Sequence, residues 1–171
     1  MRPIAVKSGT KLDLAKAAVW QYSSCHMASR AESLVATILG GRKVLGGITD
    51  AADFVLAVRR GLPYASLEAL TGALEADLGE VSEVVGIAAR TLARRKHEKQ
   101  LSPIESDRLY RIAYVMHLAA STFGGLDKAR LWMQRDNRSL GGSTPLSLLD
   151  TEIGERQVEE VLLQLNHGIY A

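Results

Sequence analysis

The chain has 171 residues, enough for one domain of ordinary size or two small ones, and 47% of them are apolar, which is sufficient for a real core. Aromatic residues make up only 5%, so this core must be aliphatic and rich in alanine, a composition that favours helices over strands. One cysteine, Cys25, excludes a disulfide framework within the chain, and a net charge of +2 excludes a polycation, so a nucleic-acid role has to come from local clustering of charge.

Residues 1–48 are predicted to form an N-terminal arm followed by helices. The first eleven residues carry three cations, Arg2, Lys7 and Lys11, which are available to DNA or to a partner, although solvation of a disordered arm is the simpler interpretation. Residues 12–39 favour one or two helices, and the two glycine pairs that follow indicate a loop. The first twenty residues contain no apolar run long enough for a secretory signal or a membrane span, so we expect a soluble, cytoplasmic protein.

Two amphipathic helices are predicted next. Thr49 or Asp50 can cap a helix over Ala51–Arg60, which a glycine then ends. Ser66 is expected to cap a second helix from Leu67 to about Leu78, because its leucines repeat every three or four residues. The glycine after this helix is expected to end it.

The stretch over residues 81–101 predicts a short helix, a tight turn and a second helix. Three valines make the first helix apolar, and Gly86 can take the left-handed conformation that ends it. The second helix, from about Ala88 to Gln100, holds five cations against Glu98 alone, whereas residues 67–83 carry five acids and no Lys or Arg. Two helices joined by a short glycine-containing turn, the second one basic, have the helix-turn-helix layout that enters the DNA major groove.

Six side chains of the second helix are candidates for DNA contact: Arg90, Thr91, Arg94, Arg95, Lys96 and Lys99. The first three lie near its N-terminal half, which reads base edges in this class of protein. The last three are better placed for the phosphate backbone. A basic helix that is merely solvated is the alternative. Because one such helix binds weakly, we expect a homodimer on a repeated half-site.

A long helix and a C-terminal group of short helices complete the chain. Ser102 and Glu105 form a capping box with Pro103 between them, which predicts a helix over Pro103–Phe123. Further helices are predicted over Leu126–Gln134, from Pro145 behind its cap Thr144, and over Glu155–Asn166. The apolar faces of Leu109–Phe123 and Val158–Leu165 are candidate self-association surfaces, although intramolecular core is the simpler interpretation.

No catalytic constellation is visible in the sequence. The histidines are scattered (His26, His97, His117 and His167), and the spacings typical of metal ligands do not occur. The run GGRKVLGG lacks the spacing of a phosphate-binding loop. We therefore expect no enzymatic activity, no cofactor and no metal.

Two stretches of the chain resemble antitoxins of the Xre/MbcA/ParS type. The run TLARRKHEKQLSPIESDRLYRIAYV is similar to the helix-turn-helix and connecting helix of Xre-type antitoxins, and residues 123–171 are similar to their toxin-binding domain. The most specific matches are Phe123-Gly124, Ala129 with Trp132, Leu140-Gly141-Gly142, Pro145, Leu149, Gly154 and Gly168. The resemblance covers residues 50–171 and leaves the first 49 unmatched.

The resemblance implies an all-α fold, with a Cro/Xre-like helix-turn-helix bundle over residues 49–122 and a small helical toxin-binding domain over residues 123–171. It also implies an antitoxin paired with a RES-domain toxin that consumes NAD. The C-terminal region would cover the active site of the toxin, and the complex would repress its own operon. The candidate toxin-binding residues are Asn166, His167, Gly168, Ile169, Tyr170 and Ala171. Ordinary fraying of a chain end is the alternative for this tail.

Other functions stay open from the residues alone. The chain would also suit a helix-turn-helix transcriptional regulator without a toxin partner, or a partition or structural helix-turn-helix protein. The acidic residues 150–160 carry a net charge of −4, and either face a basic toxin surface or are solvated. Co-purification with the product of a neighbouring gene would separate these functions.

Overall fold

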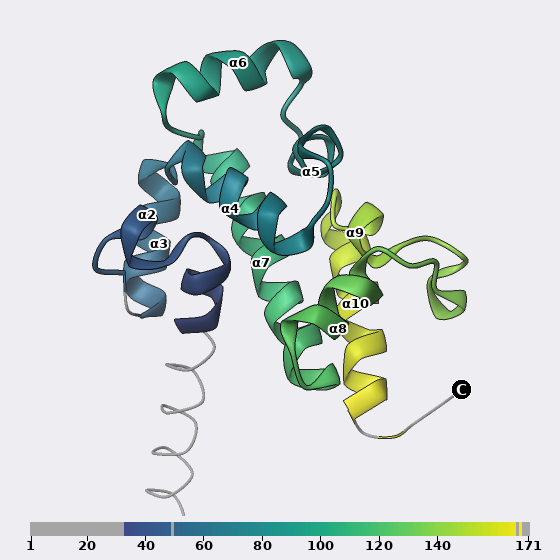
Figure 1. Cartoon of the computed structure of the whole chain (residues 1–171). Coiled ribbons are helices and arrows are strands. Elements are labelled where there is room, and N and C mark those ends of the chain that lie inside the picture. Colours follow the sequence, from purple (N-terminus) through teal and green to yellow (C-terminus); the bar gives the residue numbers. More distant parts are fainter. Residues whose placement is uncertain (1–32, 49, 167, 169–171) are drawn as a thin grey trace, which may run out of the picture.

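The computed structural model describes residues 33–48, 50–166 and 168, and within these residues the chain is helical with short connections (Figure 1). Residues 33–38 are helical and precede the labelled elements. The elements then run α2 (Gly41–Leu45), α3 (Ala51–Arg60), α4 (Tyr64–Leu74), α5 (Leu78–Val85), α6 (Ala89–Glu98), α7 (Pro103–Phe123), α8 (Leu126–Met133), the 3₁₀ turn η1 (Arg138–Leu140), α9 (Pro145–Leu148) and α10 (Glu152–Asn166). The only β-type pairing in the described part is an isolated bridge between Pro63 and Gln100, so the all-α prediction is confirmed.

The 21-residue helix α7 is the centre of the fold. It packs against α3, α4 and α5 along one part of its surface and against α8 and α10 along another (Figure 1). Its buried side chains, among them Leu109, Ile112 and Met116, join one continuous apolar cluster that includes buried residues from every labelled helix except α2 and α6. None of the described helices is long and apolar enough to cross a membrane.

The start of α7 confirms the predicted capping box. The Ser102 hydroxyl accepts a hydrogen bond from the Glu105 backbone N–H at 3.3 Å, and the Glu105 carboxylate accepts one from the Ser102 N–H at 2.7 Å. Pro103 occupies the first helical position, where a missing N–H costs nothing. Ser106 extends this polar cluster, because its buried hydroxyl accepts from the Leu62 N–H at 2.7 Å.

The prediction of one helix from Leu67 to Leu78 is wrong. The helix α4 already begins at Tyr64, so Ser66 is a buried helical residue and not a cap. It ends at Leu74, because Glu75 takes the left-handed conformation with φ of 50°. Asp77 then caps a new helix, α5, by accepting hydrogen bonds from the second and third N–H groups beyond it, and Leu78 belongs to that helix.

The predicted loop between the glycine pairs at 40–41 and 46–47 is also wrong, since the short helix α2 lies between them. Positive φ angles at Gly40 and Gly46 turn the chain sharply on either side. Leu45 is partly buried against the core, so packing keeps this single turn helical. The last helix, α10, starts at Glu152 and not at the predicted Glu155.

Candidate nucleic-acid interface

The turn between α5 and α6 has the geometry that the sequence predicts. Gly86 is left-handed with φ of 80°, and its N–H donates to the Glu83 carbonyl at 2.8 Å. The Ile87 N–H reaches back to the Ser82 carbonyl at 2.7 Å, which completes a Schellman motif, and the Ile87 side chain is buried. A Cβ at position 86 would collide with the guanidinium of Arg108, a group that donates to the Val85 carbonyl at 3.3 Å. Glycine therefore serves both the turn and this capping contact.

The helix α6 crosses one end of the molecule and leaves most of its surface open (Figure 1). Its N-cap, Ala88, has no side chain that can accept a hydrogen bond, and its first turn contains no acidic residue. The positive end of the helix dipole is therefore not neutralised within the helix. The side chain of Leu92 faces the core and is partly buried. The open N-terminal turn can therefore approach an anion such as a phosphate.

Four of the six predicted DNA-contacting residues are exposed in the structure, and the other two are partly buried. Arg90, Arg94, Lys96 and Lys99 are exposed, and Thr91 is half-buried. Lys99 lies just beyond the helix, in a left-handed conformation with φ of 57°. Arg95 differs from the others, because only 17% of its side chain is exposed, against 61% for Arg94 and 69% for Lys96.

Two of the exposed cations have distant acidic neighbours. The Arg94 Nε lies 3.8 Å from Glu98, and the Lys96 Nζ lies 4.0 Å from Glu68 of α4. Pairs at this distance and exposure contribute little in water. Both side chains can exchange these partners for a phosphate at low cost.

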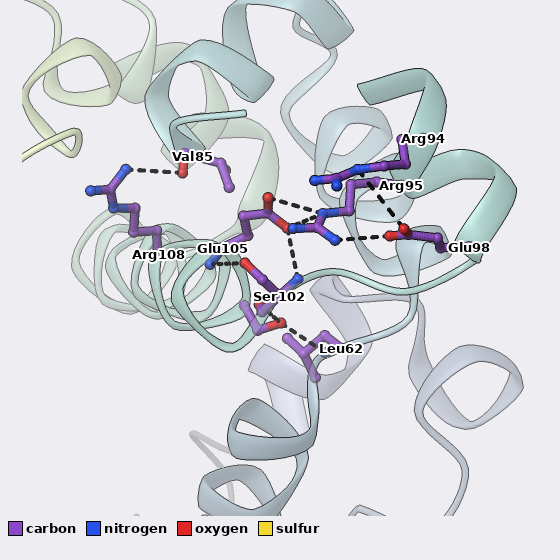
Figure 2. Close-up of polar contacts among 9 residues, drawn as sticks. Leu62, Val85, Arg94, Arg95, Glu98, Ser102, Glu105 and Arg108 are labelled. Carbon is purple, nitrogen blue, oxygen red and sulfur yellow. Dashed lines mark hydrogen bonds and ion pairs between the residues drawn. The ribbon is translucent and has the colours of Figure 1, made fainter. Parts of the chain in front are cut away.

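Arg95 is held from two sides (Figure 2). Its Nε lies 2.8 Å from Glu105 Oε2, and its Nη1 donates to Glu98 Oε2 at 2.8 Å. The hydrogen bond to Glu98 raises the pKa of the Arg95 guanidinium above its ordinary value, and Glu105 acts in the same direction against the effect of burial. The sequence pattern indicated Glu105 only as a capping residue. Its contact with α6 depends on where α7 starts in space, and no local spacing signals that.

The segment after α6 is fixed by the connection between α3 and α4. The Leu101 N–H donates to the Leu62 carbonyl at 2.9 Å, and the Tyr64 N–H donates to the Lys99 carbonyl at 3.0 Å. The Gln100 side-chain amide donates to the Arg60 carbonyl at 2.8 Å. These bonds place the C-terminal end of α6, whereas the turn at Gly86 places its beginning.

The C-terminal helices α8 and α10 pack on α7 and form the second candidate surface. Trp132 of α8 packs on Phe123 with ring centroids 5.4 Å apart, and Arg111 of α7 donates to Glu155 of α10 at 2.8 Å. Arg130 of α8 binds the Glu75 carboxylate at the end of α4, and Gln134, the residue just after α8, binds the Leu74 carbonyl. The C-terminal helices are thus tied directly to the turn that precedes the helix-turn-helix.

Only part of the predicted toxin-binding tail lies in the described residues. Asn166 is the exposed last residue of α10, and Gly168 is left-handed with its N–H donating to the Leu165 carbonyl at 3.2 Å. His167, Ile169, Tyr170 and Ala171 lie outside the described residues. The exposed face of α10 also carries Ile153 and Leu163, 74% and 57% exposed.

Glu159 on α10 predicts a pH effect. Its half-buried position, and then the nearby Glu155, raise the pKa of the Glu159 carboxyl above its ordinary value. The folded state then binds more protons than the unfolded state, so this residue destabilises the fold at neutral pH and ceases to do so as pH falls through its raised pKa. We expect Glu159→Gln to raise the melting temperature at pH 7. The gain over the wild type should shrink as the pH is lowered toward 4.5, and a gain that is constant with pH would contradict this.

Among the described residues, no group of three or more His, Cys, Asp or Glu side chains is placed to hold a metal ion. The two candidate surfaces are the open basic helix α6 and the C-terminal helices that pack on α7.

Comparison with known proteins matches both parts of the chain. Residues 53–114 match the Antitoxin Xre-like helix-turn-helix domain, and residues 118–168 match the Antitoxin Xre/MbcA/ParS C-terminal toxin-binding domain. Three curated relatives carry the name Antitoxin Xre. The chain is 38% identical over 94 residues to the one from Yersinia enterocolitica, 40% over 83 residues to that from Pseudomonas putida, and 35% over 114 residues to that from Photorhabdus laumondii. These alignments span 54%, 48% and 66% of this chain, and 64%, 52% and 77% of the respective relatives.

Proposed function

This chain belongs to the Xre antitoxins, and from that premise we propose that it neutralises a RES-domain toxin while repressing its own operon. The toxin would consume NAD, and the C-terminal region of this chain would cover its active site. The work would take place in the cytoplasm, in a complex built on a homodimer of this chain. The proposal requires no catalysis, cofactor or metal from the antitoxin itself.

The observation that carries the DNA-binding half is the exposure of α6. Its N-terminal turn is open, and four of its predicted contact residues point their charges into solvent: Arg90, Arg94, Lys96 and Lys99. Arginine is the commonest reader of guanine, and lysine neutralises phosphate. The cations of α6 make few and weak ion pairs, and two of them are exposed arginines, Arg90 and Arg94. This supports binding in a DNA groove over a helix that is merely solvated.

The test of this half is binding to the promoter of the chain's own operon. Purified protein, with its toxin bound, should prefer that promoter to random duplex at moderate salt. The logarithm of the binding constant should fall with the logarithm of the salt concentration by about 0.9 for each phosphate neutralised. Equal affinity for both duplexes would refute repression by this route.

The toxin-binding half is supported by the matched C-terminal domain and by the surface of α10. This helix presents Ile153 and Leu163 to solvent, where both apolar side chains are available to a protein partner. The tail beyond α10 carries Ile169 and Tyr170, and buried aromatics often dominate interface energies. We therefore place the tail in the toxin's pocket and the face of α10 against its rim.

Deleting Gly168–Ala171 should release the activity of the toxin while the antitoxin stays folded. The deleted residues follow the last helix in the sequence, so the loss should fall on pocket coverage. Cells that co-express the toxin from the neighbouring gene should lose NAD and stop growing with the truncated antitoxin, but grow with the full chain. A helical circular dichroism spectrum equal to that of the full chain serves as the control. Normal growth with the truncated chain would show that the tail is dispensable.

A further inference from the structure

The one largely buried cation of α6 is bound to the N-terminal cap of α7. Figure 2 shows the side chain of Arg95 directed at Glu105. The two side chains are 2.8 Å apart, and they are 17% and 11% exposed respectively. The same Glu105 carboxylate accepts the Ser102 N–H at 2.7 Å. One carboxylate thus closes the capping box and holds the basic helix.

Between its two ends, which backbone hydrogen bonds hold in place, the helix α6 has few side-chain contacts with the rest of the fold. None of its residues is fully buried, and Leu92 is the main side chain that it shares with the core. An ion pair taken out of water is favourable only in a narrow range of geometries, because each charge loses hydration that its partner must replace. Glu105 is already fixed by the capping box, so it can hold Arg95 in one place. The pair therefore adds a fixed side-chain contact to a helix that has little apolar anchoring between its ends.

We propose that Arg95 and Glu105 are positioning residues, which set the orientation of α6 on α7, and that Arg95 does not contact nucleic acid. The sequence alone placed Arg95 among the phosphate contacts, together with Lys96 and Lys99. The inference rests on the proposed DNA-binding function for its effect on the operator. Its structural part, the fixing of α6, stands apart from that function.

Two substitutions break the pair between α6 and α7, and Arg95→Gln also removes the ion pair with Glu98 inside α6. Glu105→Gln keeps an oxygen that accepts the Ser102 N–H, because glutamine also serves in a capping box, but it removes the charge that faces Arg95. Arg95→Gln removes the other partner. Each single substitution should weaken operator binding about tenfold, and the double substitution should also weaken it about tenfold, because both changes remove the same interaction. Arg95→Lys should fall between wild type and Arg95→Gln, since lysine keeps the charge but lacks the guanidinium fork.

The salt dependence separates positioning from phosphate contact. Arg95→Gln should leave the slope of binding against salt unchanged and should leave affinity for random duplex unchanged. Lys96→Gln is the matched control on the same helix, with a side chain that is 69% exposed. It should lower the slope by about 0.9 and weaken binding to operator and random duplex alike. In a double variant, the losses of operator affinity caused by Lys96→Gln and Glu105→Gln should multiply, because the two residues act independently.

Hydrogen exchange on the full chain without DNA tests the same pair independently. Both single variants should exchange the amides of α6 at least several-fold faster than wild type, with exchange in the centres of α7 and α10 unchanged. Unchanged exchange in α6 would overturn the proposal, as would a slope that drops in Arg95→Gln or single-variant effects that multiply in the double variant. If the wild type showed no preference for its promoter, the proposed repression would fail, while hydrogen exchange would still decide whether the pair positions α6.

Discussion

Replacing Gly154 with alanine should lower the free energy of unfolding by about 3 kcal/mol, the upper part of the usual range for overpacking a close contact. Gly154 is buried in the first turn of α10, and an added Cβ would overlap the backbone carbonyl of Leu148 at the end of α9. A backbone atom cannot rotate aside as a side chain can. The helix α10 would have to move away from α9, and it would lose part of its packing on α7.

Urea unfolding measures this effect, with Gly72→Ala as the matched control. Gly72 lies in α4 with an exposed surface and open space around the position of a Cβ. Alanine there should raise the free energy of unfolding by about 0.5–1 kcal/mol, because it loses less backbone entropy than glycine in a helix. Gly154→Ala should also fail to protect cells from the toxin. An unfolding midpoint equal to that of wild type would mean that α9 and α10 tolerate the extra atom.

Substituting the two exposed arginines of α6 should abolish preference for the operator. Arg90 and Arg94 lie on the open side of the helix, and a bidentate arginine–guanine contact provides about 1–3 kcal/mol of discrimination. The double variant with glutamine at both positions should therefore bind its promoter and random duplex with similar affinity. Competition binding at fixed salt measures the ratio of the two constants.

The matched comparison is a variant with glutamine at Lys96 and Lys99. These side chains are exposed near the C-terminal end of α6 and are expected to touch phosphates. Their loss should weaken binding to all duplexes and lower the salt slope by about 1.8, at about 0.9 for each phosphate, while the preference for the promoter persists. A loss of preference in the lysine variant, or its retention in the arginine variant, would reverse the assigned roles.

Local signals account for the parts of the fold that the sequence predicted well. The turn at Gly86 and the capping box from Ser102 to Glu105 were both predicted because each uses residues that few other conformations favour. The break between α4 and α5 was missed because Glu75, which is not a glycine, takes the left-handed conformation there. A glutamate gives no warning of such a turn, and the leucine repeat runs on past it.

In the candidate site, too, the sequence predicts what depends on local spacing and misses what depends on contacts between distant helices. Exposure of Arg90 and Arg94 follows from their spacing on an amphipathic helix, because both lie opposite Leu92, so the sequence suffices to propose them. The burial of Arg95 depends on Glu105, a residue whose position is set by the packing of another helix. Likewise, Arg130 and Gln134 reach the end of α4 across more than fifty residues of chain. Periodicity reports which face of a helix is apolar, and it carries no information about which distant side chain a polar residue will meet.

The helix α7 supports both candidate surfaces, the basic helix α6 and the C-terminal helices. At its start Glu105 holds the DNA-facing helix, and farther along Phe123 and Arg111 receive Trp132 and Glu155 of the C-terminal helices. A protease that cut the connection between α8 and α9 and stripped away α10 would open the apolar side of α7 to water. What remained would be a poor folding unit, and it would be digested in turn. Under the proposed function, turnover of this antitoxin should therefore release the promoter and the toxin in a single event, and no clipped form that still represses should accumulate.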